Sequence, residues 1–254
     1  MNLGKSFKLM VRNILVNTDP GTLMFLVAMP AMYLIFMGFM FGGLINNIPG
    51  FNYKEFLTPG IMGFDTVSAG AIAGSLLWSD RRYGMFEQIL TAPYTRSEYL
   101  FGILYATIFL SLIGSVILLI ISQVLVIHIY MSAAGLIFMI VNIIIGGLFW
   151  GFLFLALAAK TRSNQAYNSI QIFIIFFADF ASTVFYPLTS KTPAALKYMF
   201  YINPLTYIAN GIRSGYLSSI NSGTLTEFFI LLSETIIMGI IAILLYRKVR
   251  VGTT

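Results

Sequence analysis

The feature that most constrains this chain is a series of apolar segments, each long enough to cross a lipid bilayer as an α-helix. A membrane-spanning helix needs about 20 apolar residues, and runs of that length recur throughout the 254 residues. Charged residues make up 9% of the chain, whereas a soluble domain of this size carries roughly 25%. The sequence therefore predicts an all-α membrane protein with six transmembrane helices, near 22–45, 56–78, 99–127, 135–159, 167–186 and 227–246.

Two of these predicted helices begin with local capping signals. Thr58 followed by Pro59 predicts the start of the second span, with threonine as the cap and proline at the first helical position. Thr95 with Glu98 three residues later predicts a capping box at the start of the third span.

The amino-terminal segment 3–17 has the pattern of an amphipathic helix. Its apolar side chains share one face at helical spacing, and its basic side chains lie toward the other. A helix of this kind lies in the membrane interface with its apolar side toward lipid; an ordinary basic flank is the alternative interpretation. The apolar face consists of Leu3, Phe7, Met10, Val11, Ile14 and Leu15, and the basic face of Lys5, Lys8 and Arg12.

Lysine and arginine alternate between the predicted loops, so that eleven lie on one side of the membrane and four on the other. Cytoplasmic loops carry the excess of these residues. The pattern predicts a multi-pass protein of the cell (plasma) membrane with both termini in the cytoplasm. Orientation in the membrane thus explains the net charge of +6, and we expect no nucleic-acid partner.

We interpret 1–254 as a single transmembrane domain with two informative connections. The loop at 79–98 is long, charged and predicted to be cytoplasmic. The segment 187–216 is predicted to be external but is far from hydrophilic, and two helical patterns too short to span flank the break at Asn203-Pro204. Two short re-entrant helices in the outer leaflet fit this segment, because backbone at that depth needs hydrogen-bond partners.

The sequence lacks the motifs of common catalytic and phosphate-binding sites. It contains no GxxxxGK[ST], no HExxH and no GxSxG, and it has no cysteine and one histidine, His128. Thiolate catalysis, cysteine metal sites and a multi-histidine metal site within one chain are therefore excluded. We expect no catalytic residue, metal or cofactor in this chain, so energy for transport must come from a partner or from a gradient.

Acidic and aromatic residues within the spans are candidates for a transport path. A charge near the bilayer centre is costly, so Asp65, Asp179 and Glu234 are functional candidates. The alternative is that they pair structurally or reach an interface. Phe173 and Phe177 belong to a series with helical spacing on the fifth span, which either lines a route for an apolar or sugar-like substrate or packs against lipid and core.

Several motifs resemble those of the ABC-2 family of transport permeases. Residues 56–60, FLTPG, resemble the family's proline-glycine start of the second span. Residues 79–93, SDRRYGMFEQILTAP, resemble its charged stretch E-R-E-x-G-T-x-E-x-L-L-x-T-P, with Met85 in place of the usual threonine. Residues 186–188 (YPL) and 203–207 (NPLTY) resemble its external signature. The resemblance in helix layout covers nearly the whole chain.

This resemblance implies roles for two groups of residues. The loop after the second span would be a coupling helix that docks in a groove of a cytoplasmic ATPase, with Phe86, Ile89 and Leu90 as an apolar ridge. The external segment would form a gate region. The implied coupling residues are Arg81, Arg82, Gly84, Phe86, Glu87, Ile89, Leu90 and Pro93, and the implied gate residues are Pro187, Asn203, Pro204 and Tyr207.

The resemblance further implies the permease subunit of an ATP-driven exporter, nearest to the drug-exporter branch. Two permease chains, expected as a homodimer in membrane lipid, would pair above two cytoplasmic ABC ATPase subunits, which bind ATP and Mg. The substrate would be hydrophobic or amphipathic, drug-like or lipid-like; export of lipid-linked polysaccharide is an alternative. A gradient-driven transporter or channel without an ATPase is an alternative of another class, supported by Asp65 and Asp179. A membrane-embedded enzyme ranks last.

Overall fold

A computed structural model describes residues 2–45, 52–125, 131–189 and 192–249 of this protein. The helices are α1 (Leu3–Val16), α2 (Pro20–Leu23), the π-helix η1 (Met24–Ala28), α3 (Met29–Ile45), α4 (Tyr53–Arg82), α5 (Met85–Thr91), α6 (Arg96–Leu125), α7 (Ala133–Lys160), α8 (Asn164–Phe180), α9 (Ala194–Ile202), α10 (Pro204–Tyr216) and α11 (Ser222–Arg247). No strand occurs in the described ranges, which confirms the all-α prediction. His128 and the predicted end of the third span at 127 lie outside the described residues.

Five helical segments of the described chain are long and apolar enough to cross a membrane. They are Pro20–Gly42, Tyr53–Arg82, Arg96–Val124, Ala133–Lys160 and Ser222–Arg247. The predicted fifth span corresponds to α8, whose 17 residues lie at the lower limit for crossing a bilayer. The multi-pass membrane architecture is therefore clear, and α8 is the helix on which the sixth crossing depends.

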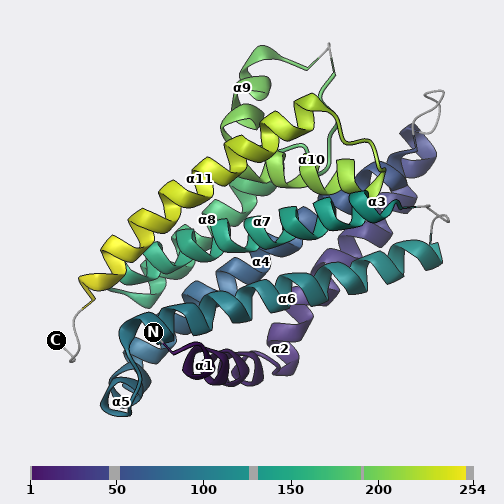
Figure 1. Cartoon of the computed structure of the whole chain (residues 1–254). Coiled ribbons are helices and arrows are strands. Elements are labelled where there is room, and N and C mark those ends of the chain that lie inside the picture. Colours follow the sequence, from purple (N-terminus) through teal and green to yellow (C-terminus); the bar gives the residue numbers. More distant parts are fainter. Residues whose placement is uncertain (1, 46–51, 126–130, 190–191, 250–254) are drawn as a thin grey trace.

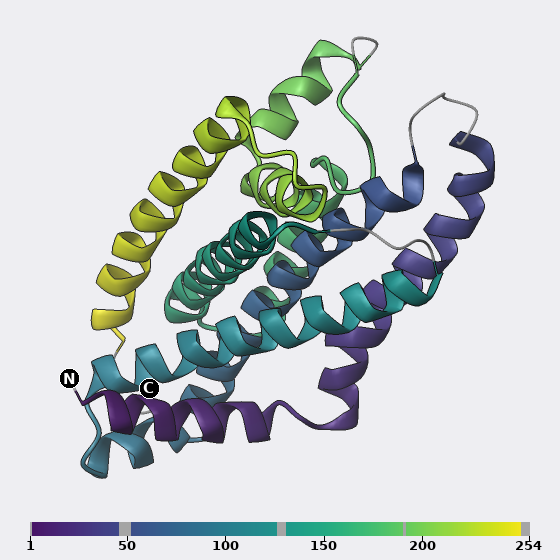
Figure 2. The same cartoon turned by 45° about the vertical axis from the view of Figure 1, so that its right-hand side comes forward.

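The long helices form a bundle around α4. Helices α3, α6, α7 and α10 all pack against α4, while α11 packs against α7 and α1 against α6. Figures 1 and 2 place α1, α5 and both chain ends at one end of this bundle, and α9 at the other. The end that contains α1 and α5 is called the α5 end below.

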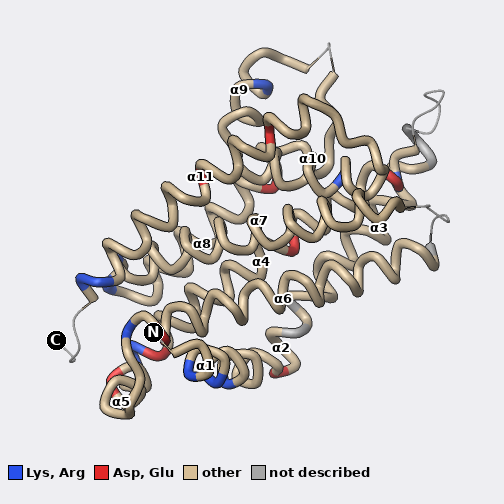
Figure 3. Tube along the Cα trace, in the orientation of Figure 1, with Lys and Arg blue, Asp and Glu red and all other residues tan. Residues whose placement is uncertain are grey.

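Charge follows the same division of the bundle. Lysine and arginine collect on α1, around α5 and at the end of α11, whereas the middles of the long helices carry few charges (Figure 3). Charged groups are costly within the hydrocarbon core of a bilayer. The middle of the bundle, where charges are few, is therefore the part suited to lipid.

Small residues allow α4 to occupy the centre. A Cβ atom at Gly70 would lie 2.5 Å from Trp150 Cβ, and one at Gly74 would meet the Phe154 backbone of α7 at 2.6 Å. The two glycines therefore bring α4 and α7 into contact within one chain. Because protein surrounds α4, it tolerates polar residues, and its mean hydropathy of 1.3 is the lowest of the five spans.

The predicted start of the second span was wrong. Helix α4 begins at Tyr53, capped by the Asn52 side chain, which accepts a hydrogen bond from the Lys54 amide at 3.1 Å. Pro59 lies inside the helix rather than at its first position. Asn52 supplies a cap six residues before Thr58, so the helix begins there. The predicted Thr95–Glu98 capping box is confirmed, with hydrogen bonds of 2.9 and 3.3 Å.

The predicted end of the fifth span also differs from the structure. Helix α8 ends at Phe180 instead of 186, and residues 181–185 form a buried turn. Ser182 donates to the Asp179 carbonyl at 2.8 Å, and Asn203 donates to the Ala181 carbonyl at 2.8 Å. These side chains satisfy carbonyls that a continuing helix would have used. The two short helices expected near 187–216 are present as α9 and α10.

The first span contains a local irregularity that sequence reasoning missed. Helices α2 and α3 are joined by the five-residue π-helix η1, and Pro30 is the second residue of α3. Proline has no backbone N–H and its ring displaces the preceding turn, so a widened turn immediately before it is expected.

Candidate functional site

The candidate site is the α4–α5 hairpin at the α5 end. Gly84 sits between the two helices with φ of 73°, in the left-handed region that favours glycine. Helix α5 then runs for seven residues to Thr91, and its C-cap residue Ala92 directly precedes Pro93. Gly84 thus reverses the chain, and Pro93 prevents the short helix from continuing.

Phe86 holds α5 against the bundle. Its side chain is completely buried, with ring centroids 5.1 Å from Tyr99 of α6 and 6.1 Å from Tyr246 of α11, both edge to face. Ile89 and Leu90 are partly buried against the same cluster. The expected apolar docking ridge therefore needs correction: Phe86 faces inward, because an apolar stripe on a short helix packs first against its own bundle.

The exposed side of the hairpin contains Arg82, which was predicted as a coupling residue, together with three residues that sequence reasoning did not select. Tyr83 is 77% exposed and Met85 38% exposed, and Gln88 is also exposed. Arg82 is exposed and lies over the Trp78 ring at 5.6 Å. The helical spacing of Phe86, with Ile89 and Leu90, could have indicated that the opposite side of α5 faces outward.

Two predicted coupling residues contact the rest of the chain. Arg81 donates to the Ala158 carbonyl at 2.6 Å at the end of α7, where a cation is favourable to unpaired carbonyls and to the helix dipole. The Pro93 carbonyl accepts a hydrogen bond from the Lys5 ammonium of α1. Both residues therefore position the hairpin.

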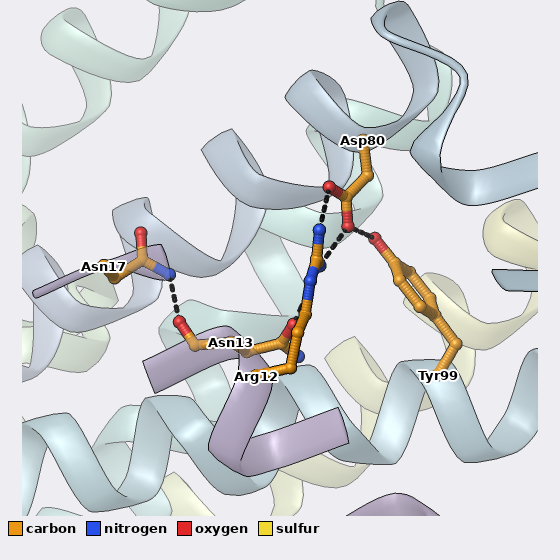
Figure 4. A network of polar contacts seen from close by, with 5 residues as sticks. All are labelled: Arg12, Asn13, Asn17, Asp80 and Tyr99. Atoms are coloured by element: carbon orange, nitrogen blue, oxygen red, sulfur yellow. Dashed lines mark hydrogen bonds and ion pairs between the residues drawn. The ribbon is translucent and has the colours of Figure 1, made fainter. Parts of the chain in front are cut away.

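The strongest attachment is a polar network between three helices (Figure 4). Arg12 of α1 donates two hydrogen bonds to the Asp80 carboxylate, at 2.6 and 2.8 Å, and Tyr99 of α6 donates a third at 2.8 Å. The hydrogen bond that Arg12 donates to Asp80 raises the pKa of Arg12 above its ordinary value, although burial opposes this. A bidentate guanidinium–carboxylate pair fixes orientation as well as distance, so α1 is held in register with the end of α4.

Further hydrogen bonds gather both chain ends around this hairpin. The Asn2 amide donates to Glu98 Oε1 at 2.8 Å. Arg96 donates to the Val249 carbonyl at 2.8 Å, and the Tyr246 hydroxyl donates to the Arg96 carbonyl at 3.0 Å. The α5 hairpin is thus connected to α1, α6, α7 and α11, so a displacement of α5 would be transmitted to all four.

The predicted transport-path residues do not share one surface. Asp65 is fully buried, with its carboxylate in the space beside Gly114 of α6 where a Cβ atom would clash. Asp179 is 4% exposed, whereas Phe173 and Phe177 on the outer face of α8 are 68% and 49% exposed. The structure therefore separates two buried acids from an exposed aromatic face.

The predicted gate residues Asn203, Pro204 and Tyr207 form a corner between helices. Asn203 accepts a hydrogen bond from the Leu205 amide at 3.0 Å and so caps α10, while its amide group donates to the Ala178 carbonyl of α8 at 2.7 Å. Pro204 is the first residue of α10, and the Tyr207 hydroxyl donates to a carbonyl at the end of α9. Pro187, part of the same external segment, is partly buried.

Arg213 is a structural residue that the sequence reasoning counted only as an external charge. Its guanidinium donates to the Phe56 carbonyl at 3.2 Å and to the Thr183 carbonyl at 3.0 Å, and it lies 3.8 Å over the Phe56 ring. It therefore ties α10 to the start of α4 and to the turn after α8. Local sequence carries no signal for these distant partners.

The chain was compared with known proteins. The sequence model of the family described as "ABC-2 type transporter" matches residues 6–217. A putative transport permease, ycf38, of Porphyra purpurea is 30% identical over 241 residues, covering 91% of this chain and 79% of the relative. The ycf38 protein of Cyanophora paradoxa is 30% identical over 250 residues, covering 91% and 83%.

A more distant relative is the inner membrane transport permease YadH of Escherichia coli K12. It is 20% identical over 201 residues, covering 79% of this chain and 77% of the relative. These matches do not favour a gradient-driven transporter or channel. Family members are transport permeases, which in general work with an ATPase partner. The family match over most of the length and the multi-pass helical fold together show that this chain belongs to the ABC-2 type transporter family.

Proposed function

We propose that this protein is the permease subunit of an ATP-driven exporter that moves a hydrophobic or amphipathic substrate out of the cell. The observation that carries the proposal is the α5 hairpin: a short helix at one end of the bundle, attached to α1, α6, α7 and α11 and exposing Arg82, Tyr83, Met85 and Gln88. A rigidly attached helix with an exposed polar and aromatic face suits docking to a partner. The partner would be a cytoplasmic ABC ATPase, which binds the ATP and Mg.

In this proposal the chain crosses the plasma membrane six times, with α8 as the short fifth span. The α5 end, which carries most of the described basic residues, faces the cytoplasm, and so do both termini. Helices α9 and α10 lie in the outer leaflet as re-entrant helices. Burial of α10 against α4 and α7 supports this arrangement, because a short helix within the membrane needs protein neighbours at its ends.

A second copy of the chain is the proposed permease partner. The exposed phenylalanines of α8 offer it an aromatic face inside the membrane, where Phe173 and Phe177 are stacked at 6.1 Å. Cross-linking a Phe177→Cys variant in membranes should give a homodimer. A matched Ile240→Cys variant, on the exposed face of α11, should give none. Equal cross-linking of the two variants would contradict this assignment.

The absence of native cysteine makes site-specific cross-linking the direct test of ATPase docking. Gln88→Cys places a single thiol on the exposed face of α5. After treatment of native membranes with a photoactivatable maleimide, mass spectrometry should identify a P-loop ATPase attached to this variant. Lys8→Cys, an exposed position on α1 at the same end, is the matched control and should give much less of this product. If Gln88→Cys labels fully but captures no ATPase, docking at α5 is wrong.

A further inference from the structure

A polar pocket lies near the α5 end, separate from the coupling hairpin. It has a volume of about 400 Å³ and is bounded by the link between α1 and α2, by α4 and by α8. Its polar lining residues are Asn17, Asp19, Thr22, Ser75 and Gln171, and Ile72 forms an apolar wall. This concentration of hydrogen-bonding groups is unusual in a chain that is 58% hydrophobic.

The position of the pocket places it just inside the predicted cytoplasmic surface. Asp19 immediately precedes the first span. Ser75 lies seven residues before the end of α4 and Gln171 seven residues after the start of α8, which corresponds to about 10 Å along each helix. The pocket therefore lies at the depth where a polar group enters the apolar part of the bilayer.

On the side of α9, aromatic rings pack between α3, α4 and the turn after α8. Tyr33 of α3 has its ring centroid 5.9 Å from Phe64 of α4 and 5.8 Å from Phe185. Phe64 is eight residues from Ile72 along α4, or about 12 Å. An aromatic, apolar region thus lies beyond the polar pocket, on the side of α9.

The lining groups define the kind of ligand that fits. Asp19 is the one charged residue among the described residues that line the pocket, and none of those residues is lysine or arginine. A hydrogen bond from the Thr22 side chain, followed by one from its backbone amide, lowers the pKa of Asp19, so its carboxylate remains charged at neutral pH. An anionic group would meet a like charge there, whereas a protonated amine would meet an opposite one.

Gln171 adds hydrogen-bond donors to the pocket. Ser75 donates to Gln171 Oε1 at 3.3 Å, which leaves the amide N–H groups of Gln171 with no partner among the described residues. Gln171 is partly exposed, so these N–H groups can donate to an acceptor atom of a ligand in the pocket.

We propose that this pocket binds the cationic, hydrogen-bonding head of an amphipathic substrate before it passes between α3 and α8. This inference rests on the proposed export function, because the ligand is taken to be the exported substrate. It adds to that function a binding site and a preference for cations. Asp19 attracts the cation, Gln171 and Ser75 orient polar atoms, and Ile72 contacts the apolar part next to the head.

The test uses the purified permease in nanodiscs of neutral phosphatidylcholine, without any ATPase. The probe is radiolabelled tetraphenylphosphonium, a lipophilic cation, with empty nanodiscs subtracted. Wild type should bind the probe saturably, and tetraphenylborate, an anion of similar shape, should not compete. Asp19→Asn, which retains a good helix cap, should weaken binding about fivefold, as expected for one exposed charge pair. Glu55→Gln removes an acid at the other end of α4 and should bind like wild type.

Gln171→Leu provides an independent test of the pocket wall, with unlabelled lauroylcholine as the competitor. Tetraphenylphosphonium has no hydrogen-bonding atom, whereas the ester oxygens of lauroylcholine can accept from the Gln171 amide, so competition by lauroylcholine should weaken several-fold in this variant. The proposal is overturned if wild type shows no saturable binding, if tetraphenylborate competes equally, or if neither Asp19→Asn weakens binding of tetraphenylphosphonium nor Gln171→Leu weakens competition by lauroylcholine. If Gln88→Cys captures an ATPase but the protein fails this binding assay, the permease function stands and the cationic pocket is rejected. If binding is saturable and depends on Asp19 but no ATPase is captured, the cationic pocket stands and the ATP-driven permease function is rejected.

Discussion

Replacing Phe86 with alanine should release α5 from the bundle. The ring is fully buried and makes two edge-to-face contacts, with Tyr99 and Tyr246. Truncation of a buried phenylalanine to alanine costs about 3–5 kcal/mol, which includes the aromatic pairs at about 0.5–1.5 kcal/mol each. Because about 1.4 kcal/mol is a factor of ten in an equilibrium constant, local opening of α5 should become roughly a thousandfold more frequent.

Hydrogen exchange measured by mass spectrometry on the purified chain tests this directly. Amides of Met85–Thr91 should lose about three orders of magnitude of protection in Phe86→Ala, while those in the middle of α7 keep theirs. Tyr83→Ala is the matched control, because Tyr83 is 77% exposed and its loss should change stability by less than about 0.5 kcal/mol. If protection of α5 changes by less than about fivefold in Phe86→Ala, or equally in both variants, the ring does not hold the helix.

Three further substitutions test the other attachments. Asp80→Asn removes the bidentate pair with Arg12 and should loosen α1 by about 1–3 kcal/mol; limited trypsin digestion should cleave α1 faster, and an unchanged rate would count against the network. Asn203→Asp keeps the helix cap but loses the hydrogen bonds donated to the carbonyls of Ala178 and Ala181 at the end of α8, so the melting temperature should fall by an amount equivalent to about 2–3 kcal/mol; a melting temperature equal to wild type would contradict this role. Gly70→Ala should sharply reduce folded protein on size-exclusion chromatography, because its Cβ atom would lie 2.5 Å from Trp150; Gly63→Ala, whose nearest contact is 3.4 Å, should be tolerated, and equal yields would refute the close-packing argument.

Local sequence was sufficient where the determinant of structure was itself local. The Thr95–Glu98 box marks the start of α6 because both partners lie within one helical turn. Asn203-Pro204 separates α9 from α10 because asparagine caps and proline favours the first helical position. Long apolar runs likewise predicted the spanning helices, since the requirement for about 20 apolar residues depends on composition alone.

Sequence reasoning failed where a competing cap or a distant contact decided the outcome. The Thr58-Pro59 pair has the features of a helix start, but Asn52 caps the same helix earlier. The role of Arg213 depends on the Phe56 carbonyl, 157 positions away in sequence. For Phe86, the pattern correctly indicated an apolar stripe but could not distinguish a face toward a partner from a face toward the chain's own bundle.

The two proposed sites are connected by a single rigid element. Asp80, which attaches α1, and Ser75, which lines the polar pocket, are five residues apart on α4, or about 7.5 Å. Helix α4 is continuous from Tyr53 to Arg82 and is buried over nearly its whole length, so it has little freedom to bend between them. A force applied to α5 would therefore move α4 together with α1, whose link to α2 forms the opposite wall of the pocket. Displacing both walls relative to α8 would change the width of the pocket, which gives a partner docked at α5 mechanical access to a substrate bound there.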